Sequence, residues 1–238
     1  MKKKKIVIVA ANPAISTTTG WPVGFWASEV THPYKKFIQA GYEVTLASPQ
    51  GGKLSMDTLS DPFDESGYSA WDEISKEVIP STWFQQAIAD SPSLDSIDLD
   101  KYDVLLIAGG QAPMFNFEGD AGLIKNFADF YQSGKITAAL CHGTAILNYA
   151  KDQSGKLIAR GKNVTGFTND EEEDADKAAG VKVMPWRIED ALKMAGANFM
   201  QASNWQSYVV IDGNLITGQQ NMSGEAVADA IIEKLENR

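Results

Sequence analysis

Short apolar runs that alternate with helical segments constrain the fold of this chain more than any other feature of its sequence. The apolar runs span residues 6–10, 42–47, 104–108 and 136–140. Segments with helical character lie between or after them, at residues 29–40, 121–132 and 224–235. A continuous apolar strand needs protein on both of its faces, and alternating helices supply that cover. The sequence therefore predicts an α/β fold in which a parallel sheet is sandwiched between helices.

The later part of the chain predicts smaller elements on the same plan. Residues 163–167 are expected to form a further short strand, and residues 185–195 a helix. The apolar runs 207–211 and 214–217 flank Asp212-Gly213, a dipeptide typical of a tight hairpin turn. We expect residues 1–238 to form a single domain.

Residues 50–100 differ in composition from the rest of the chain. They are rich in Ser, Asp, Pro and Gly, yet they also contain Trp71, Trp83 and Phe84. These aromatic residues argue against a disordered linker. We expect an insertion with short helices that packs over the sheet edge or over a pocket.

Charge and cysteine content exclude several classes of protein. The 238 residues carry a formal net charge of −10, which disfavours nucleic acid and anionic membrane surfaces as partners. No apolar run reaches the roughly 18 residues of a membrane-spanning helix. The single cysteine rules out an internal disulfide, so the cytoplasm is the expected compartment. One cysteine and two histidines also argue against a metal site, and we expect no metal and no cofactor.

The tripeptide Cys141-His142-Gly143 carries the strongest chemical signal. It contains the only cysteine and one of the two histidines, and it follows the apolar run 136–140 directly. A thiol between a strand and a helix lies at a helix N-terminus, where the dipole and backbone N–H groups favour the thiolate. The adjacent histidine can relay protons near neutral pH. The simpler alternative is a buried structural cysteine beside an incidental histidine.

Three further groups are expected near this thiol, because ligands of such sheets bind beyond the carboxyl ends of the strands. Glu29 begins a helix and can exchange a proton with the thiol or the substrate, although acids are common in first helical turns. Gly109-Gly110 follows a strand and can present N–H groups to an oxyanion. The acidic run 170–174 can supply a carboxylate that orients His142, although such runs are usually solvated.

Five segments together resemble the ThiJ/PfpI superfamily, whose fold is the flavodoxin-like fold of class I glutamine amidotransferases. They are GFWASEV at 24–30, IAGG at 107–110, AALCHGTA at 138–145, VTGFTNDEE at 164–172 and GQQNMS at 218–223. Their order matches that of the superfamily over nearly the whole chain. The large insertion is similar to that of the glyoxalase III and heat-shock chaperone branch.

The resemblance implies a glyoxalase that converts methylglyoxal to lactate without glutathione or metal. It assigns catalysis to Cys141, His142, Glu29 and Glu172, with Glu171 as the alternative to Glu172. It implies that Gly109, Gly110, Gln111 and Gly143 bind the substrate or an oxyanion. Gln111 departs from the branch, in which a histidine is frequent at this place. The implied partners are a small aldehyde substrate and a second copy of the chain in a homodimer.

Other functions stay open on the sequence alone. Relatives with the same nucleophile are described as cysteine peptidases or amidases of the PfpI type. A stress chaperone would need an exposed apolar patch, and a redox sensor would need an accessible cysteine of low pKa. His32, which Pro33 follows, is interpreted as a packing or capping histidine. Trp21, Trp26, Trp186 and Trp205 could line a pocket, but aromatic residues in an α/β protein are more often core or interface, so we assign none of them to the site.

Overall fold

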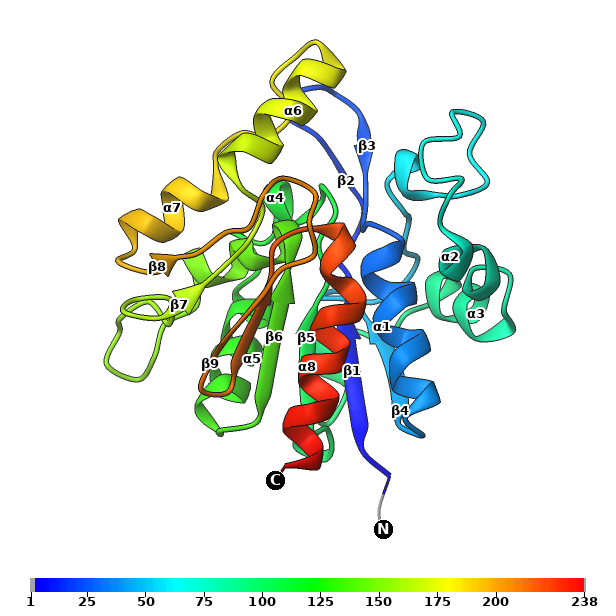
Figure 1. The fold of residues 1–238 in the computed structure, drawn as a ribbon. Coiled ribbons are helices and arrows are strands. Elements are labelled where there is room, and N and C mark those ends of the chain that lie inside the picture. The colour runs from blue at the N-terminus through cyan, green and yellow to red at the C-terminus, as the bar shows by residue number, and fades with distance from the viewer. Residues whose placement is uncertain (1–2, 238) are drawn as a thin grey trace.

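A six-stranded sheet lies at the centre of the computed structural model, which describes residues 3–237 (Figure 1). Its strands, in spatial order, are β4 (Glu43–Ala47), β1 (Lys5–Val9), β5 (Val104–Ile107), β6 (Ile136–Leu140), β10 (Leu215–Gly218) and β9 (Val209–Asp212). All neighbours are parallel except β9 and β10, which form the expected hairpin. The prediction of a helix-covered α/β sheet is confirmed, with one antiparallel strand at its edge.

Two small sheets lie outside the central one. One pairs β2 (Ala14–Ile15) with β3 (Pro22–Val23), and the other pairs β7 (Asn163–Val164) with β8 (Asn198–Phe199). The strand expected over residues 163–167 is therefore shorter than predicted. Its backbone leaves the ladder where Thr165 donates its N–H to the Thr217 hydroxyl at 2.9 Å.

Helices cover both faces of the central sheet. They are α1 (Ser28–Gln39), α2 (Glu73–Val78), α3 (Thr82–Ala89), α4 (Pro113–Asn116), α5 (Ala121–Gln132), α6 (Asn169–Ala179), α7 (Ile188–Met194) and α8 (Gly224–Glu236). Short 3-10 helices span Thr58–Ser60, Leu94–Ser96, Leu99–Lys101, Cys141–Asn148 and Asn221–Ser223. Helices α1 and α8 pack together over one face, and α5 lies on the other (Figure 1).

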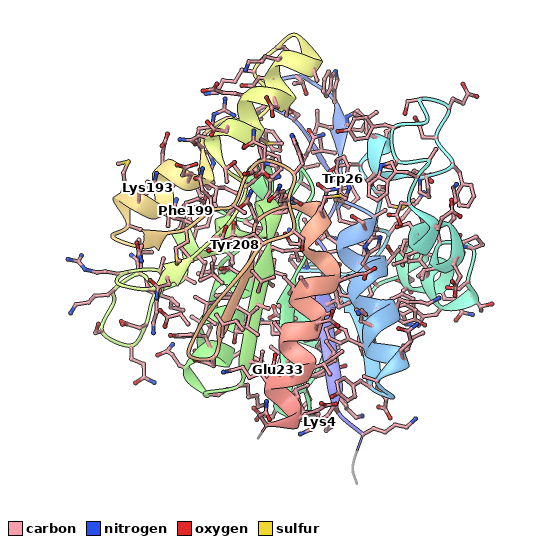
Figure 2. The ribbon with its side chains drawn as sticks, viewed as in Figure 1. Lys4, Trp26, Lys193, Phe199, Tyr208 and Glu233 are labelled. Atoms are coloured by element: carbon pink, nitrogen blue, oxygen red, sulfur yellow. The ribbon has the colours of Figure 1, made fainter. Side chains whose placement is uncertain are left out.

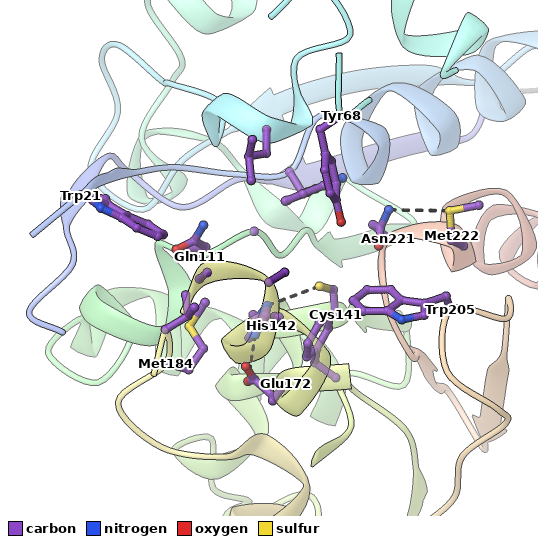
Figure 3. Close-up of a pocket in the computed structure, with 18 of the residues that line it drawn as sticks. Trp21, Tyr68, Gln111, Cys141, His142, Glu172, Met184, Trp205, Asn221 and Met222 are labelled. Carbon is purple, nitrogen blue, oxygen red and sulfur yellow. Dashed lines mark hydrogen bonds and ion pairs between the residues drawn. The ribbon is translucent and has the colours of Figure 1, made fainter. Parts of the chain in front are cut away.

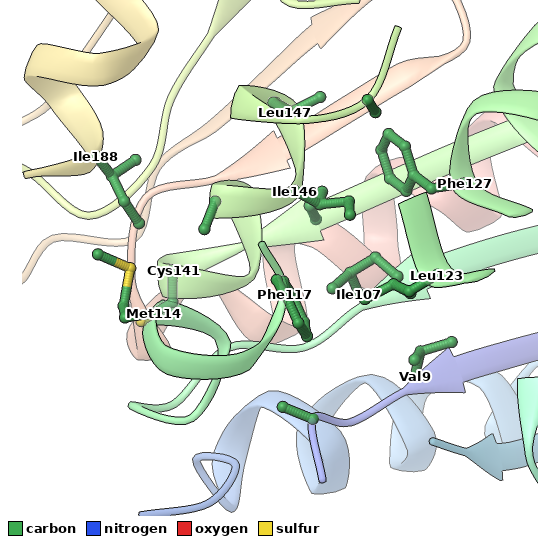
Figure 4. Close-up of a cluster of buried hydrophobic side chains, with 14 of the residues drawn as sticks. Val9, Ile107, Met114, Phe117, Leu123, Phe127, Cys141, Ile146, Leu147 and Ile188 are labelled. Carbon is green, nitrogen blue, oxygen red and sulfur yellow. The ribbon is translucent and has the colours of Figure 1, made fainter. Parts of the chain in front are cut away.

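Alternation along the strands explains why both faces are covered. In β1, Ile6 and Ile8 pack with Phe37 of α1, whereas Val7 and Val9 join the core on the other face. Successive side chains of a strand point to opposite faces, so an unbroken apolar strand buries two layers. The same alternation in β6 directs the next residue, Cys141, toward the second core (Figure 4).

The insertion is anchored on α1 by buried polar contacts. His32 Nε2 lies 2.8 Å from Asp72 Oδ1, and the Thr31 and Ser75 hydroxyl oxygens are 2.7 Å apart. His32 is thus a packing residue, as expected from its sequence context. The insertion forms short helices and reaches over the end of the sheet where Trp26 lies, opposite Lys4 and Glu233 (Figures 1 and 2).

Within residues 3–237, no helix combines the length and the apolar composition that crossing a membrane requires.

Candidate active site

Cys141 occupies a strained turn between β6 and the 3-10 helix that it begins. Its φ is +55°, a left-handed value that is costly for a residue with a side chain. Such strain persists where the surrounding structure fixes it, and it is frequent at active sites. Cys141 is 3% exposed and packs in the core, yet it also lines a cavity (Figures 3 and 4).

A chain of polar contacts runs from the sulfur into α6. Cys141 Sγ lies 3.4 Å from His142 Nδ1, and His142 Nε2 lies 3.1 Å from Glu172 Oε1 (Figure 3). The Phe167 ring stacks on the imidazole, with 4.3 Å between the ring centroids. The imidazole is therefore held by a carboxylate on one edge and an aromatic face, with its other nitrogen toward the thiol.

The acidic run does not form a wholly solvated face, because Glu171 and Glu172 are buried. Thr168 caps α6 and exchanges hydrogen bonds with Glu171, whose other oxygen accepts bonds from Trp205 and Gln219. Glu171 thus fixes the helix start and a neighbouring loop. Of these two side chains, Glu172 is the one that contacts His142.

Arg187, just before α7, supports Glu172 from behind. Arg187 Nη1 lies 3.1 Å from Glu172 Oε2, and Arg187 Nη2 pairs with Asp176. The Glu172 contact lacks hydrogen-bond alignment, so the two groups interact chiefly through charge. No sequence pattern points to Arg187, because only the packing of α6 against α7 brings it near Glu172.

We expect Arg187→Met to lower the free energy of unfolding by about 3 kcal/mol, because it leaves the buried Glu172 carboxylate without its cation. Urea denaturation followed by circular dichroism measures this change. Lys177→Met is the matched control, because Lys177 pairs with Glu173 and Asp174 only at the exposed surface of α6. Its expected cost is about 0.5 kcal/mol or less. Equal costs for the two variants would contradict the role assigned to Arg187.

Glu29, in the first turn of α1, reaches the same thiol from the other side. The Gly109 N–H donates to Glu29 Oε2 at 2.6 Å, and the carboxyl group is fully buried. Burial raises the pKa of Glu29 from 4.5 to about 8, against the lowering effect of hydrogen bonds from Cys141 and Gly109. The carboxyl group therefore holds a proton in most molecules at neutral pH.

The expectation of a resting thiolate is not met. Burial raises the pKa of the Cys141 thiol well above its usual range, and the nearby Glu29 raises it further. Backbone N–H groups of His142 and Gly110 act in the opposite direction but do not prevail. The helix that Cys141 begins is a 3-10 helix, whose hydrogen-bond geometry is poorer than that of an α-helix. The thiol thus needs a base at the moment of reaction.

The glycines and Gln111, which were expected to bind an oxyanion or the substrate, differ in their contacts. Gly109 donates its N–H to Glu29, so this N–H is not available to an oxyanion, contrary to the expectation. Gly143 packs against the backbone of Ile107 and Ala108, where a Cβ atom would lie 2.8 Å from both carbonyl oxygens. Gly110 and Gln111 do line the cavity.

Asp57, from the insertion, positions the segment that contains Gly110 and Gln111. Its two carboxyl oxygens accept the N–H groups of Gly24 at 2.8 Å and Gln111 at 2.7 Å. Burial raises the pKa of Asp57 to about 6. Nothing in the sequence pattern pointed to this residue, whose partners lie 33 and 54 positions away.

The cavity above the sulfur measures about 380 Å³. Aromatic residues form a large part of its lining. They include Trp21, Trp26 and Trp205, which the sequence left open between a pocket and the core or an interface. They also include Tyr68 and Trp71 from the insertion, which confirms that it packs over a pocket. Trp186 lies elsewhere, against Tyr149.

The donor set gives no indication of a metal centre. Among residues 3–237, no cluster of three or more His, Cys, Asp or Glu side chains has the arrangement needed to hold an ion.

Known proteins are similar to this chain in sequence and in fold. The chain is 29% identical to a probable glutathione-independent glyoxalase of Schizosaccharomyces pombe, over 91% of this chain and 92% of that protein. It is 27% identical to a glutathione-independent glyoxalase of Saccharomyces cerevisiae, over 99% of both. The X-ray structure of the Francisella tularensis Rapid Encystment Protein 24 kDa superposes with a TM-score of 0.87 at 31% identity, covering 98% and 99% of the two chains. The model of the DJ-1/PfpI family matches residues 22–234, and the chain belongs to that family.

Proposed function

We propose that this chain is a cysteine-dependent, glutathione-independent glyoxalase that converts methylglyoxal to lactate. The observation that carries the proposal is that Cys141 and His142 line one cavity, with Glu29 buried against the sulfur and Glu172 in contact with the histidine. Similarity to two yeast proteins with that name supports it. The substrate class is accordingly a small 2-oxoaldehyde.

The first step joins the thiol to the aldehyde. With Nε2–H donating to Glu172, His142 Nδ1 keeps a lone pair toward Sγ and accepts the thiol proton. A C–S bond forms as the C=O π bond breaks, and the oxygen takes a proton to give a hemithioacetal. The N–H of Gly110, beside the sulfur, is placed to stabilise the developing negative oxygen.

The second step moves a proton between the two substrate carbons. A base removes the C1 hydrogen as a proton and the ketone oxygen gains one, which gives an enediol. C2 then gains a proton while the C1 hydroxyl loses its own, and the carbonyl of a thioester forms at C1. Glu29 is suited to this shuttle, because a pKa near 8 lets it both release and accept a proton near neutral pH. Gln111 Oε1, which is buried and has no hydrogen-bond partner among residues 3–237, can accept a hydrogen bond from the enediol hydroxyl.

Water then cleaves the thioester and returns the thiol. The sum is one oxoaldehyde plus one water to one 2-hydroxy acid, and no oxidant or reductant enters. We favour a glyoxalase over a peptidase because the two yeast relatives named above are glyoxalases.

The test is the conversion of methylglyoxal to lactate by purified protein without glutathione, followed by proton NMR in D₂O. We expect lactate that carries deuterium at C2, because side chains that exchange with solvent deliver the proton. Heat-denatured protein is the control. Absence of lactate, or formation of lactate only with added glutathione, would contradict the proposal.

A further inference from the structure

The cavity above Cys141 leaves far more room than a three-carbon aldehyde occupies. An apolar cavity of about 150 Å³ already holds benzene, which has more heavy atoms than methylglyoxal. The cavity here measures about 380 Å³. Cavities of about 300–1,000 Å³ are typical of sites that enclose drug-sized ligands. Most of this volume therefore lies beyond the reacting carbons.

The walls of that extra space are apolar and combine aliphatic residues with six aromatic ones. The lining includes Trp21, Trp26, Tyr68, Trp71, Phe167 and Trp205. Trp21 and Trp205 lie on opposite sides of the cavity, and Tyr68 lies across from His142 (Figure 3). Aromatic side chains in this arrangement favour a flat apolar group, which they contact by stacking or edge-to-face.

Charged side chains are almost absent from the lining. Among the described residues that line the cavity, only His142 and Glu172 carry ionisable groups of opposite sign, and they bind each other. None of the lysines and arginines within residues 3–237 lines the cavity. A phosphate or carboxylate substituent would lose its hydration without gaining a cation, so a neutral substituent is favoured.

Trp205 is held in a strained backbone conformation. Its φ is +61°, the other left-handed value of a non-glycine residue besides Cys141 in the described chain. Its backbone N–H donates to Glu171 at 2.9 Å and its indole N–H to Asp174 at 3.2 Å. Trp205 is nevertheless 39% exposed. Strain of this kind is frequent at ligand clamps, and the ring gains cover when the cavity is filled.

We propose that the preferred substrate is a 2-oxoaldehyde whose second substituent is a neutral aromatic group, that is, an arylglyoxal. The inference rests on the proposed glyoxalase function and names its substrate class. The bonds made and broken are those of the methylglyoxal reaction, and the product is an aryl 2-hydroxy acid. The aryl group lies among the aromatic walls while C1 meets the sulfur.

The test compares kcat/KM for phenylglyoxal and methylglyoxal. We expect phenylglyoxal to exceed methylglyoxal at least about tenfold, since even one methylene in an apolar pocket changes kcat/KM by about 10- to 200-fold. Trp71→Ala should lower the phenyl-to-methyl ratio about fivefold, the size of one aromatic contact. A change in this ratio is independent of the intrinsic reactivity of the two aldehydes.

Phe63→Ala is the matched control. Phe63 belongs to the same insertion and is 57% exposed, against 52% for Trp71, but it does not line the cavity. We expect its phenyl-to-methyl ratio to equal that of the wild type. A wild-type ratio of one or less, or an equal fall in both variants, would overturn the inference while leaving the glyoxalase function intact.

A binding experiment decides the inference even if neither aldehyde is consumed, which is the outcome that would refute the function. Acetophenone, which cannot turn over, should slow the alkylation of Cys141 by iodoacetamide at concentrations where acetone has no effect. Cys141 is the only cysteine, so intact mass reports this reaction directly. Trp71→Ala should weaken the protection. Equal protection by the two ketones would overturn the inference.

Discussion

Cys141→Ala is expected to lower kcat for methylglyoxal by a factor on the order of 10⁴ or more, as removal of a covalent nucleophile does in other enzymes. The reason is that no other group at the floor of the cavity can form the hemithioacetal. The rate of lactate formation measures the loss. The far-ultraviolet circular dichroism spectrum should stay that of the wild type, because alanine keeps the Cβ atom and the buried site.

Cys141→Gly separates the nucleophile from the backbone strain. The left-handed conformation at Cys141 costs a residue with a Cβ atom about 1–2 kcal/mol, and glycine does not incur this cost. We expect the glycine variant to be as inactive as the alanine variant but about 1 kcal/mol more stable in urea. Activity in either variant would contradict the role of the thiol as nucleophile. A glycine variant less stable than the alanine variant would contradict the backbone strain assigned to this position.

Glu29→Gln is expected to change how the free energy of unfolding depends on pH, and also to lower the activity. The pKa of Glu29 is about 8 in the folded protein, against an ordinary value of 4.5 for this side chain. The folded state therefore holds a proton that the unfolded state releases. Between these two pH values, the free energy of unfolding falls by up to about 1.4 kcal/mol per pH unit.

Glutamine resembles the protonated acid and lacks this slope. Relative to the wild type, Glu29→Gln should gain up to about 4 kcal/mol of stability between pH 5 and pH 8. The raised pKa of Asp57 contributes a slope of the same sign to both proteins, so it largely cancels in the comparison. Urea titrations at several pH values measure the difference. A difference that does not vary with pH would show that Glu29 is ionised throughout.

The same variant tests the proton shuttle. We expect kcat to fall by about 10²- to 10⁴-fold, since an amide keeps the contact with Gly109 but cannot carry a proton. The exposed Glu73→Gln is the control, and it should alter stability by no more than about 0.5 kcal/mol at any pH. Full activity of Glu29→Gln would exclude its role in the reaction.

Much of the fold could be predicted because it depends on local patterns. The helix at Ala121–Gln132 and the strand at Ile136–Leu140 have the predicted bounds. Apolar periodicity and capping residues specify such elements within a single segment. The short strand Asn163–Val164 was overestimated, because its end depends on a hydrogen bond to Thr217, more than fifty residues away.

The candidate site could be predicted in part for the same reason. Cys141, His142 and Glu29 lie at the ends of recognisable elements, so the sheet topology alone brings them to one edge. Asp57 and Arg187 act through partners that only tertiary packing provides. The protonation of the thiol could not be predicted either, because burial outweighs the helix terminus and depends on the three-dimensional surroundings.

Helix α1 carries two contacts one turn apart that have a joint consequence. Glu29 faces the sulfur, and His32 holds Asp72 of the insertion, which also supplies Tyr68 and Trp71 to the cavity wall. The acid and the part of the insertion that lines the cavity are thus both attached to helix α1. A displacement of the insertion on substrate entry would be transmitted to the carboxyl group, so the state of closure and the placement of the acidic proton would change together.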